Sequence, residues 1–216
     1  MTLTELALLR LLPPTTSTTP SLLSALSHAK TVMESYTHHH FHMLQQVEDP
    51  ALIYILGEWD SLAQHMDGFI PSAENQELLK SLDGMVEVVS LVHYDVPLTQ
   101  LPIPGAGKGG KGLVSIARHF IKPGQKETFE ETFEANKGLL QEYVAPEVCG
   151  WGWRVDREKE ADGQGEKEEF VLFSPWESVD AHLRFGKTEA FKRYAGIREW
   201  IDGADIKHAR VLELGG

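Results

Sequence analysis

Two eight-residue stretches of the chain share one pattern: WDSLAQHM at residues 59–66 and WESVDAHL at residues 176–183. Each runs tryptophan, acid, serine, an apolar residue, two variable residues, histidine and a final apolar residue. Each also follows an apolar stretch that is typical of a β-strand and precedes a helical and then a strand-like pattern. Agreement in both sequence and context indicates an internal duplication.

Working outward from these stretches, the same order of elements is predicted on both sides of the chain centre. In the first half strands are expected at 3–12, 38–47, 51–59 and 85–96, with helices from Ser21, Asp60 and Ser72. In the second half strands are expected at 113–121, 148–157, 170–174 and 206–214, with helices at 125–143, 176–183 and 188–200. The order strand, helix, strand, strand, helix, strand is the ferredoxin-like arrangement.

The predicted domain organisation is therefore a first repeat at 1–96, a linker at 97–112 and a second repeat at 113–216. The linker is rich in Pro and Gly and lacks periodicity, whereas an acidic loop at 158–168 is expected inside the second repeat. An antiparallel sheet with helices on one face leaves its other face bare. The fold class is α+β, and the two bare faces are expected to meet in an intramolecular barrel.

Charge and composition exclude several classes of function. The chain has 216 residues and a net charge of −12, which disfavours nucleic acid and anionic membrane surfaces as partners. Cys149 is the single cysteine, so an internal disulfide is impossible, and a structural role is expected for it. No apolar run reaches the roughly 18 residues of a membrane helix, and a cytoplasmic location is expected.

The residues around both motifs resemble a known family. In the first half these are the acidic turn at 48–50, the apolar strand at 54–59, His65 and the helix SAENQELL at 72–79. In the second half they are the strand at 170–176, with His182 and Phe191. This pattern resembles the antibiotic-biosynthesis-monooxygenase domains of the dimeric α+β barrel superfamily, here as a tandem pair.

The resemblance implies cofactor-free oxygenation of an aromatic or polyketide-like small molecule, with haem degradation in one branch of the family. No clear proximal histidine pattern supports haem, so no cofactor is expected. The implied partner is a hydrophobic or aromatic small molecule, and the implied assembly is a monomeric pseudo-dimer or a homodimer. A polyketide cyclase or isomerase on the same barrel, and a non-catalytic binding or interaction protein, remain alternatives.

The motif residues are the first candidates for chemistry. His65 and His182 are predicted catalytic bases, because imidazole exchanges protons near neutral pH. Trp59 and Trp176 are predicted to line a cavity and stack on a planar substrate. The structural alternative is that each tryptophan anchors its helix to the sheet, while each histidine holds the turn that follows.

Other candidates come from the strands. On a strand at 38–47, alternation places His38, His40 and His42 on one face, where His40 and His42 are expected to line the substrate cavity together with Tyr54. Three imidazoles along one strand are too far apart to share one ion without strain, so no metal site is expected.

The two first strands also carry candidate polar groups. Arg10 and His119 are expected to occupy similar places on them. If only one half keeps a working cavity, the first half is expected to be that one.

Overall fold

The computed structural model describes residues 2–104, 112–157 and 167–214. The chain divides into two compact units, which comprise residues 1–99 with 209–216 and residues 100–208. The predicted linker and acidic loop lie partly outside the described residues. Leu98, Leu101 and Ile103, at the start of that linker, are buried and therefore pack as core. Among the helices that the structure describes, none has the length and apolarity to cross a membrane.

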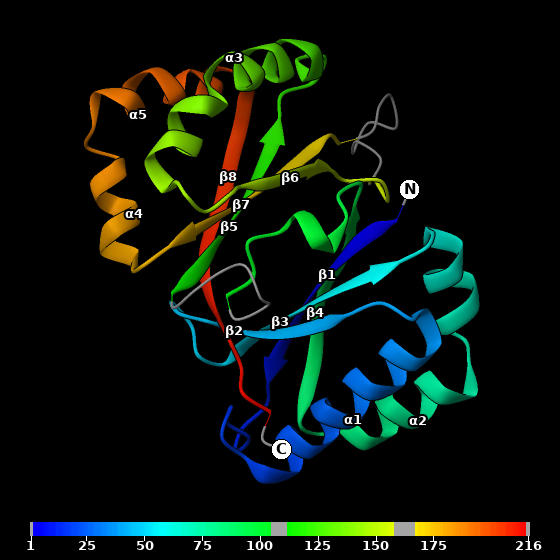
Figure 1. Cartoon of the computed structure of the whole chain (residues 1–216). Coiled ribbons are helices and arrows are strands. Elements are labelled where there is room, and N and C mark those ends of the chain that lie inside the picture. The colour runs from blue at the N-terminus through cyan, green and yellow to red at the C-terminus, as the bar shows by residue number, and fades with distance from the viewer. Residues whose placement is uncertain (1, 105–111, 158–166, 215–216) are drawn as a thin grey trace. The chain divides into compact units, whose positions relative to one another are not determined.

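The first unit has the element order strand, helix, strand, strand, helices, strand (Figure 1). Its elements are β1 (Leu3–Leu11), α1 (Pro20–Thr37), β2 (Phe41–Gln46), β3 (Leu52–Trp59), the π-helix η1 (Gln64–Phe69), α2 (Ala73–Leu82), β4 (Val86–Tyr94) and the short 3-10 helix η2 (Leu98–Gln100), which leads out of the unit. The strand order is β4-β1-β3-β2, and residues 209–211 at the end of β8 add to β2.

The register of these strands decides which side chains share a face. Leu3 pairs with Trp59, and Glu5 pairs with both Gly57 and His93. Because side chains alternate along a strand, Glu5, Trp59 and His93 point to one face. The same face packs against α1 and α2 through an apolar core that includes Phe41, Leu22, Leu26, Leu78 and Leu82.

The second unit repeats the order strand, helix, strand, strand, helices, strand (Figure 1). Its elements are β5 (Leu113–Ile121), α3 (Lys126–Val144), β6 (Gly150–Trp153), β7 (Glu169–Trp176), α4 (Val179–Phe185), α5 (Glu189–Tyr194), the 3-10 helix η3 (Ala195–Trp200) and β8 (Ile201–Val211), whose residues to 208 belong to this unit. Its strand order is β8-β5-β7-β6. Leu113 pairs with Trp176, as Leu3 pairs with Trp59 in the first unit.

The prediction for the histidine run was wrong, because β2 begins only at Phe41. Helix α1 continues to Thr37, and His38 ends it in the left-handed conformation with φ of 62°. The N–H of His38 donates to the Glu34 carbonyl 2.9 Å away, which closes the helix end. His38, His40 and His42 therefore do not share a strand face.

Candidate active site

In the first unit, the tryptophan and histidine of the motif stack on each other. The Trp59 and His65 rings lie 3.9 Å apart between centroids and are nearly parallel, with an angle of 7°. The Ser61 hydroxyl accepts the Gln64 backbone N–H at 3.1 Å, which starts the helical turn directly after the strand. That turn carries His65 back over the indole, where both side chains are almost fully buried.

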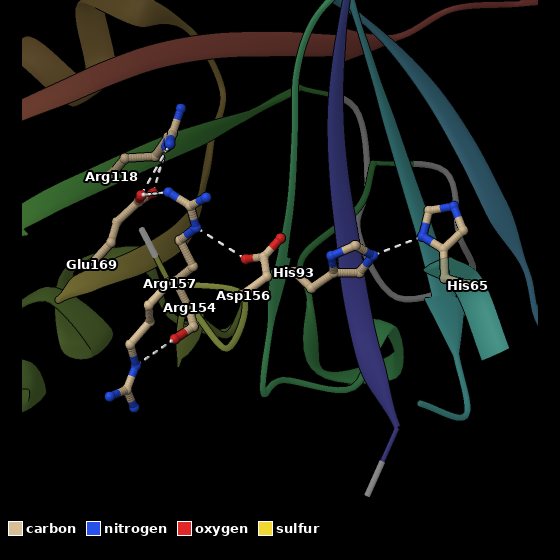
Figure 2. A network of polar contacts seen from close by, with 7 residues as sticks. All are labelled: His65, His93, Arg118, Arg154, Asp156, Arg157 and Glu169. Atoms are coloured by element: carbon tan, nitrogen blue, oxygen red, sulfur yellow. Dashed lines mark hydrogen bonds and ion pairs between the residues drawn. The ribbon is translucent and has the colours of Figure 1, made fainter. Parts of the chain in front are cut away.

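A chain of polar contacts continues from this stack. The indole N–H of Trp59 donates to Glu5 Oε2 at 2.7 Å, and His65 Nε2 lies 3.9 Å from the same oxygen. On its other side, His65 Nδ1 is 2.7 Å from His93 Nε2, and Figure 2 shows these two imidazoles pointing toward each other. Glu5 and His93 are also buried, so this whole series of polar contacts is shielded from solvent.

The protonation of Glu5 follows from this burial. Desolvation raises the pKa of its carboxyl to about 7, against the lowering effects of the Trp59 hydrogen bond and the His93 charge. Glu5 is therefore divided between its neutral and charged forms near neutral pH.

The second unit repeats the stack with different neighbours. Trp176 and His182 lie 4.3 Å apart between ring centroids at an angle of 9°, and the Ser178 hydroxyl caps the turn by accepting the Ala181 N–H at 3.1 Å. His182 Nδ1 is 2.8 Å from His208 Nε2. The indole N–H of Trp176 donates to Ser174 Oγ at 2.9 Å, so a serine hydroxyl here takes the place of a carboxylate.

His182 lines a cavity of about 110 Å³ within the second unit. The cavity lies between β5, β7 and β8 on one side and the helices α3, α4, α5 and η3 on the other. Three buried polar atoms line it and have no hydrogen-bond partner among the described residues: Ser115 Oγ, His119 Nδ1 and the Tyr194 hydroxyl. Unpaired buried polar groups cost free energy, so three around one cavity indicate a place for a ligand or ordered water.

Both histidines of this cavity are neutral at physiological pH. Burial lowers the pKa of His182 to about 4, with a further contribution from His208, and burial also lowers the pKa of His119 to about 4. His182 Nε2 makes no hydrogen bond to any described residue. When His182 Nδ1 donates its proton to His208, Nε2 keeps its lone pair and can accept a proton.

The paired registers identify which residues replace one another between the units. Counting from Leu3 and Leu113, Ser115 stands where the first unit has Glu5, and His119 stands where it has Leu9. The prediction that Arg10 and His119 occupy similar places was wrong by one residue, which puts them on opposite faces of their strands. Arg10 is paired with Asp49 and Glu87 at 3.5 Å each on the half-exposed side.

The remaining predicted substrate residues do not join the two stacks. Tyr54 is buried but alternates with Trp59 along β3, so it points to the other face, where its hydroxyl accepts a hydrogen bond from Gln46 Nε2 at 2.8 Å. The His40 side chain is 86% exposed and lies 3.6 Å from Glu34. His42 is half-buried on β2, and burial lowers its pKa.

No group of three or more His, Cys, Asp or Glu side chains within residues 2–104, 112–157 and 167–214 is arranged to hold a metal ion. The lone Cys149 is half-buried, and burial raises the pKa of its thiol to about 12. At that pKa the group is a thiol near neutral pH, whereas the nucleophilic form is the thiolate.

The opposite face of the second-unit sheet carries a structural ion network (Figure 2). Arg118, which alternates with the cavity residue His119 on β5, binds Glu169 through two hydrogen bonds of 2.6 and 3.0 Å. Arg154 adds a third contact to Glu169 at 3.3 Å and binds Asp156 at 3.0 Å. Glu169 is 3% exposed, and its buried charge is compensated by Arg118 from β5 and by Arg154 from the end of β6.

Two further cavities belong to the same unit. One of about 450 Å³ is lined by Trp176, Tyr143, Arg184 and several prolines, and one of about 310 Å³ lies beside Cys149 and Trp151. Trp176 therefore lines this larger cavity while its ring stacks on His182. These three cavities lie in the second unit, and the stack of the first unit is buried. Which half keeps a working cavity stays a prediction.

No protein-family model matches the chain, and no curated protein matches it. Solved structures do match it over nearly its whole length. An anthrone oxidase-like protein aligns with a TM-score of 0.67 at 13% identity, covering 98% of this chain and 92% of its own. This likeness shows that the chain shares the fold of that structure.

Two further structures with this fold carry different activities in their names. A provisionally assigned monooxygenase from Fusobacterium nucleatum subsp. nucleatum aligns with a TM-score of 0.64 at 12% identity, covering 98% of this chain and 93% of its own. A heme-binding protein from Thermus thermophilus aligns with a TM-score of 0.59 at 10% identity, covering 99% and 92%. At such identities the likeness establishes the fold alone.

Haem does not fit the histidine-lined cavity of this chain. Sites for ligands of drug size or more occupy about 300–1,000 Å³, and the cavity beside His182 measures about 110 Å³. The larger cavity of about 450 Å³ has room, and its described lining contains Tyr143 but none of the commoner haem ligands His, Cys and Met. The chemistry of the candidate site is therefore derived from its side chains.

The repeated motif identified the two tryptophans and two histidines, but it showed neither their stacking nor most of the cavity lining. His93 and His208 were visible as a histidine shared by the two last strands. No local pattern indicated that Ser115, His119 and Tyr194 line a cavity. They do so only because one face of the sheet packs against particular helices, which is a matter of tertiary structure. A strand register counted from the two tryptophans would have placed Ser115 and His119 correctly.

Proposed function

We propose that the chain is a cofactor-independent monooxygenase acting on an enolisable or phenolic small molecule, with its reaction site in the His182 cavity. One observation carries this proposal: His182, with an unbonded Nε2, lines a cavity in which three other buried polar atoms have no partner among the described residues. A purely structural copy of the unit needs no such groups. The solved structures named monooxygenase and anthrone oxidase-like support an oxidative activity on this fold.

In the proposed reaction His182 Nε2 takes a proton from an acidic C–H or O–H of the substrate. The resulting carbanion or phenolate reacts with molecular oxygen; at a methylene carbon, one oxygen atom becomes a carbonyl and the other leaves as water with both hydrogens. The Tyr194 and Ser115 hydroxyls line the same cavity and can donate hydrogen bonds to a developing oxyanion. Burial raises the pKa of Tyr194, so its hydroxyl keeps its proton near neutral pH.

The volume of the cavity limits what can enter it. About 110 Å³ is less than the roughly 150 Å³ of an apolar cavity that binds benzene. A tricyclic aromatic molecule could insert only its reacting edge, with the remainder outside. Trp176 stands between this cavity and the larger one, where it could contact an aromatic portion of the substrate.

The proposal also covers how the two units are related. We propose that the two units arose by duplication, that their sheets close an intramolecular barrel, and that the monomer is a pseudo-dimer. The matched strand registers and the repeated Trp–Ser–His geometry support a duplication. In this view the first unit is a packed copy that stabilises the fold, and the second carries the reaction.

Oxygen uptake with a panel of quinols and anthrones tests the function. His182→Gln is expected to abolish uptake, His65→Gln to retain it in the folded fraction, and the exposed-residue control His28→Gln to match the parent. Since the pKa of His182 is about 4, kcat/KM is expected to be flat between about pH 5 and 8. Full activity of His182→Gln would refute the assignment, and equal turnover without oxygen would indicate a cyclase or isomerase instead.

A further inference from the structure

The charge balance of the His182 cavity is one-sided. Among the residues that line it, Arg198 is the one with a permanent charge, and no Asp or Glu side chain among the described residues lines it. Arg198 is an exposed residue whose guanidinium lies 5.0 Å from the centroid of the Phe191 ring, and it forms no ion pair with any described residue. Its charge contributes to the lowered pKa of His119, so its field reaches into the cavity.

The uncharged polar groups of the cavity supply hydrogen-bond donors. Ser115 and Tyr194 have buried hydroxyls without partners among the described residues, and the Ser174 hydroxyl already accepts the Trp176 N–H, which leaves its own proton free to donate. The other walls are apolar, for example Leu140, Leu172 and Ile206. A guanidinium at an exposed position and two buried hydroxyls therefore surround a small apolar space.

We propose that this cavity binds a small organic anion of about six heavy atoms or fewer, namely a 2-oxo or 2-hydroxy acid. Its carboxylate pairs with Arg198, and its second oxygen accepts hydrogen bonds from Ser115 and Tyr194. The inference rests on the proposed function for its choice of cavity, and it narrows the substrate class from aromatic molecules to small enolisable acids. An enolisable C–H beside the carbonyl group matches a neutral imidazole base such as His182.

Binding of pyruvate, measured by isothermal titration calorimetry without oxygen, tests this inference independently of turnover. Pyruvate is expected to bind, and its neutral isostere pyruvamide is expected to bind at least about tenfold more weakly because it has no carboxylate to pair with Arg198.

Variants separate the proposed contacts from general effects. Arg198→Gln should weaken pyruvate binding about tenfold or more, while Ser115→Ala and Tyr194→Phe should each weaken it about three- to tenfold. Arg193→Gln is the matched control, because it removes the same charge from the neighbouring helix α5 at a position outside the cavity lining. It should leave the affinity unchanged.

Three results would overturn the inference: no binding of pyruvate, equal affinity of Arg198→Gln, or unchanged affinity in both hydroxyl variants. The last result would mean that the unpaired groups hold only water. If pyruvate binds in an Arg198-dependent way but no substrate consumes oxygen, the monooxygenase proposal fails and the anion site stands. If His182-dependent oxygen uptake occurs without pyruvate binding, the anion site fails and the monooxygenase proposal stands.

Discussion

The Trp–His stack occurs once in each unit, with similar geometry and different surroundings. In the first unit the Trp59 N–H meets the carboxylate of Glu5, and Leu9 lies farther along the same strand face, beyond Ala7. In the second unit the equivalent positions hold Ser115 and His119, and a cavity of about 110 Å³ opens between them and the helices. Two replacements on one strand face thus accompany the change from a packed polar cluster to a cavity.

The two surroundings also respond to pH in opposite directions. The pKa of Glu5 is raised from 4.5 to about 7 in the folded state, so folding binds a proton and the first unit loses stability as pH rises through this range. The pKa values of His119 and His182 are lowered from 6.5 to about 4, so the second unit loses stability as pH falls from 6.5 toward 4.

The largest expected effect is the loss of the packed indole. Trp59→Ala should destabilise the first unit by about 3–5 kcal/mol, because it leaves a cavity and removes the hydrogen-bond donor of Glu5. Urea denaturation with hydrogen exchange localised to each unit measures this effect. Trp176→Ala, the matched change, should cost less because Trp176 already borders a cavity. Equal losses of stability in the two variants would show that the two tryptophans are packed equally well.

The next effect concerns the buried carboxyl. Glu5→Gln should stabilise the first unit by about 3 kcal/mol at pH 8 and have little effect at pH 4, because the amide carries no charge to bury. Denaturation across pH 4–8 checks this, with the exposed Glu74→Gln as the control. A parent protein whose first unit gains stability between pH 4.5 and 7 would contradict the raised pKa.

His119 can be replaced by leucine, the residue at the equivalent position of the first unit. His119→Leu installs the residue of the first unit, and it should remove about 2–3 kcal/mol of the acid-induced loss of the second unit at pH 4. It should also impair ligand binding by filling the cavity. Hydrogen exchange of β5 and β7 as a function of pH is the measurement, and an unchanged acid profile would show that another group is responsible.

The smallest expected effect is that of a single hydroxyl. Ser115→Ala removes a buried donor that has no partner among the described residues, so it should be neutral or stabilise the second unit by up to about 1 kcal/mol, independently of pH. A thermal melt without ligand detects this change. A loss of more than about 2 kcal/mol would mean that the hydroxyl is satisfied in the folded protein by a bound molecule or water.

Much of the fold was readable from local patterns. The element order and both serine caps follow from apolar periodicity and from capping residues, which act within a few positions along the chain. The histidine run was misread as part of a strand, because α1 continues to Thr37 and only then turns at His38. Helix length here depends on packing against the sheet, through residues such as Met33, which a local pattern understates.

The Trp–acid–Ser–x–x–x–His stretches by themselves determined that each unit turns sharply from strand to helix and carries a histidine one helical turn beyond the serine. The tertiary structure decided what that histidine meets. Strand pairing places Glu5 beside one stack and Ser115 beside the other, from positions 54 and 61 residues away from the respective tryptophans. Burial and pKa depend on such distant neighbours, so the repeated motif alone could not show which unit holds the cavity.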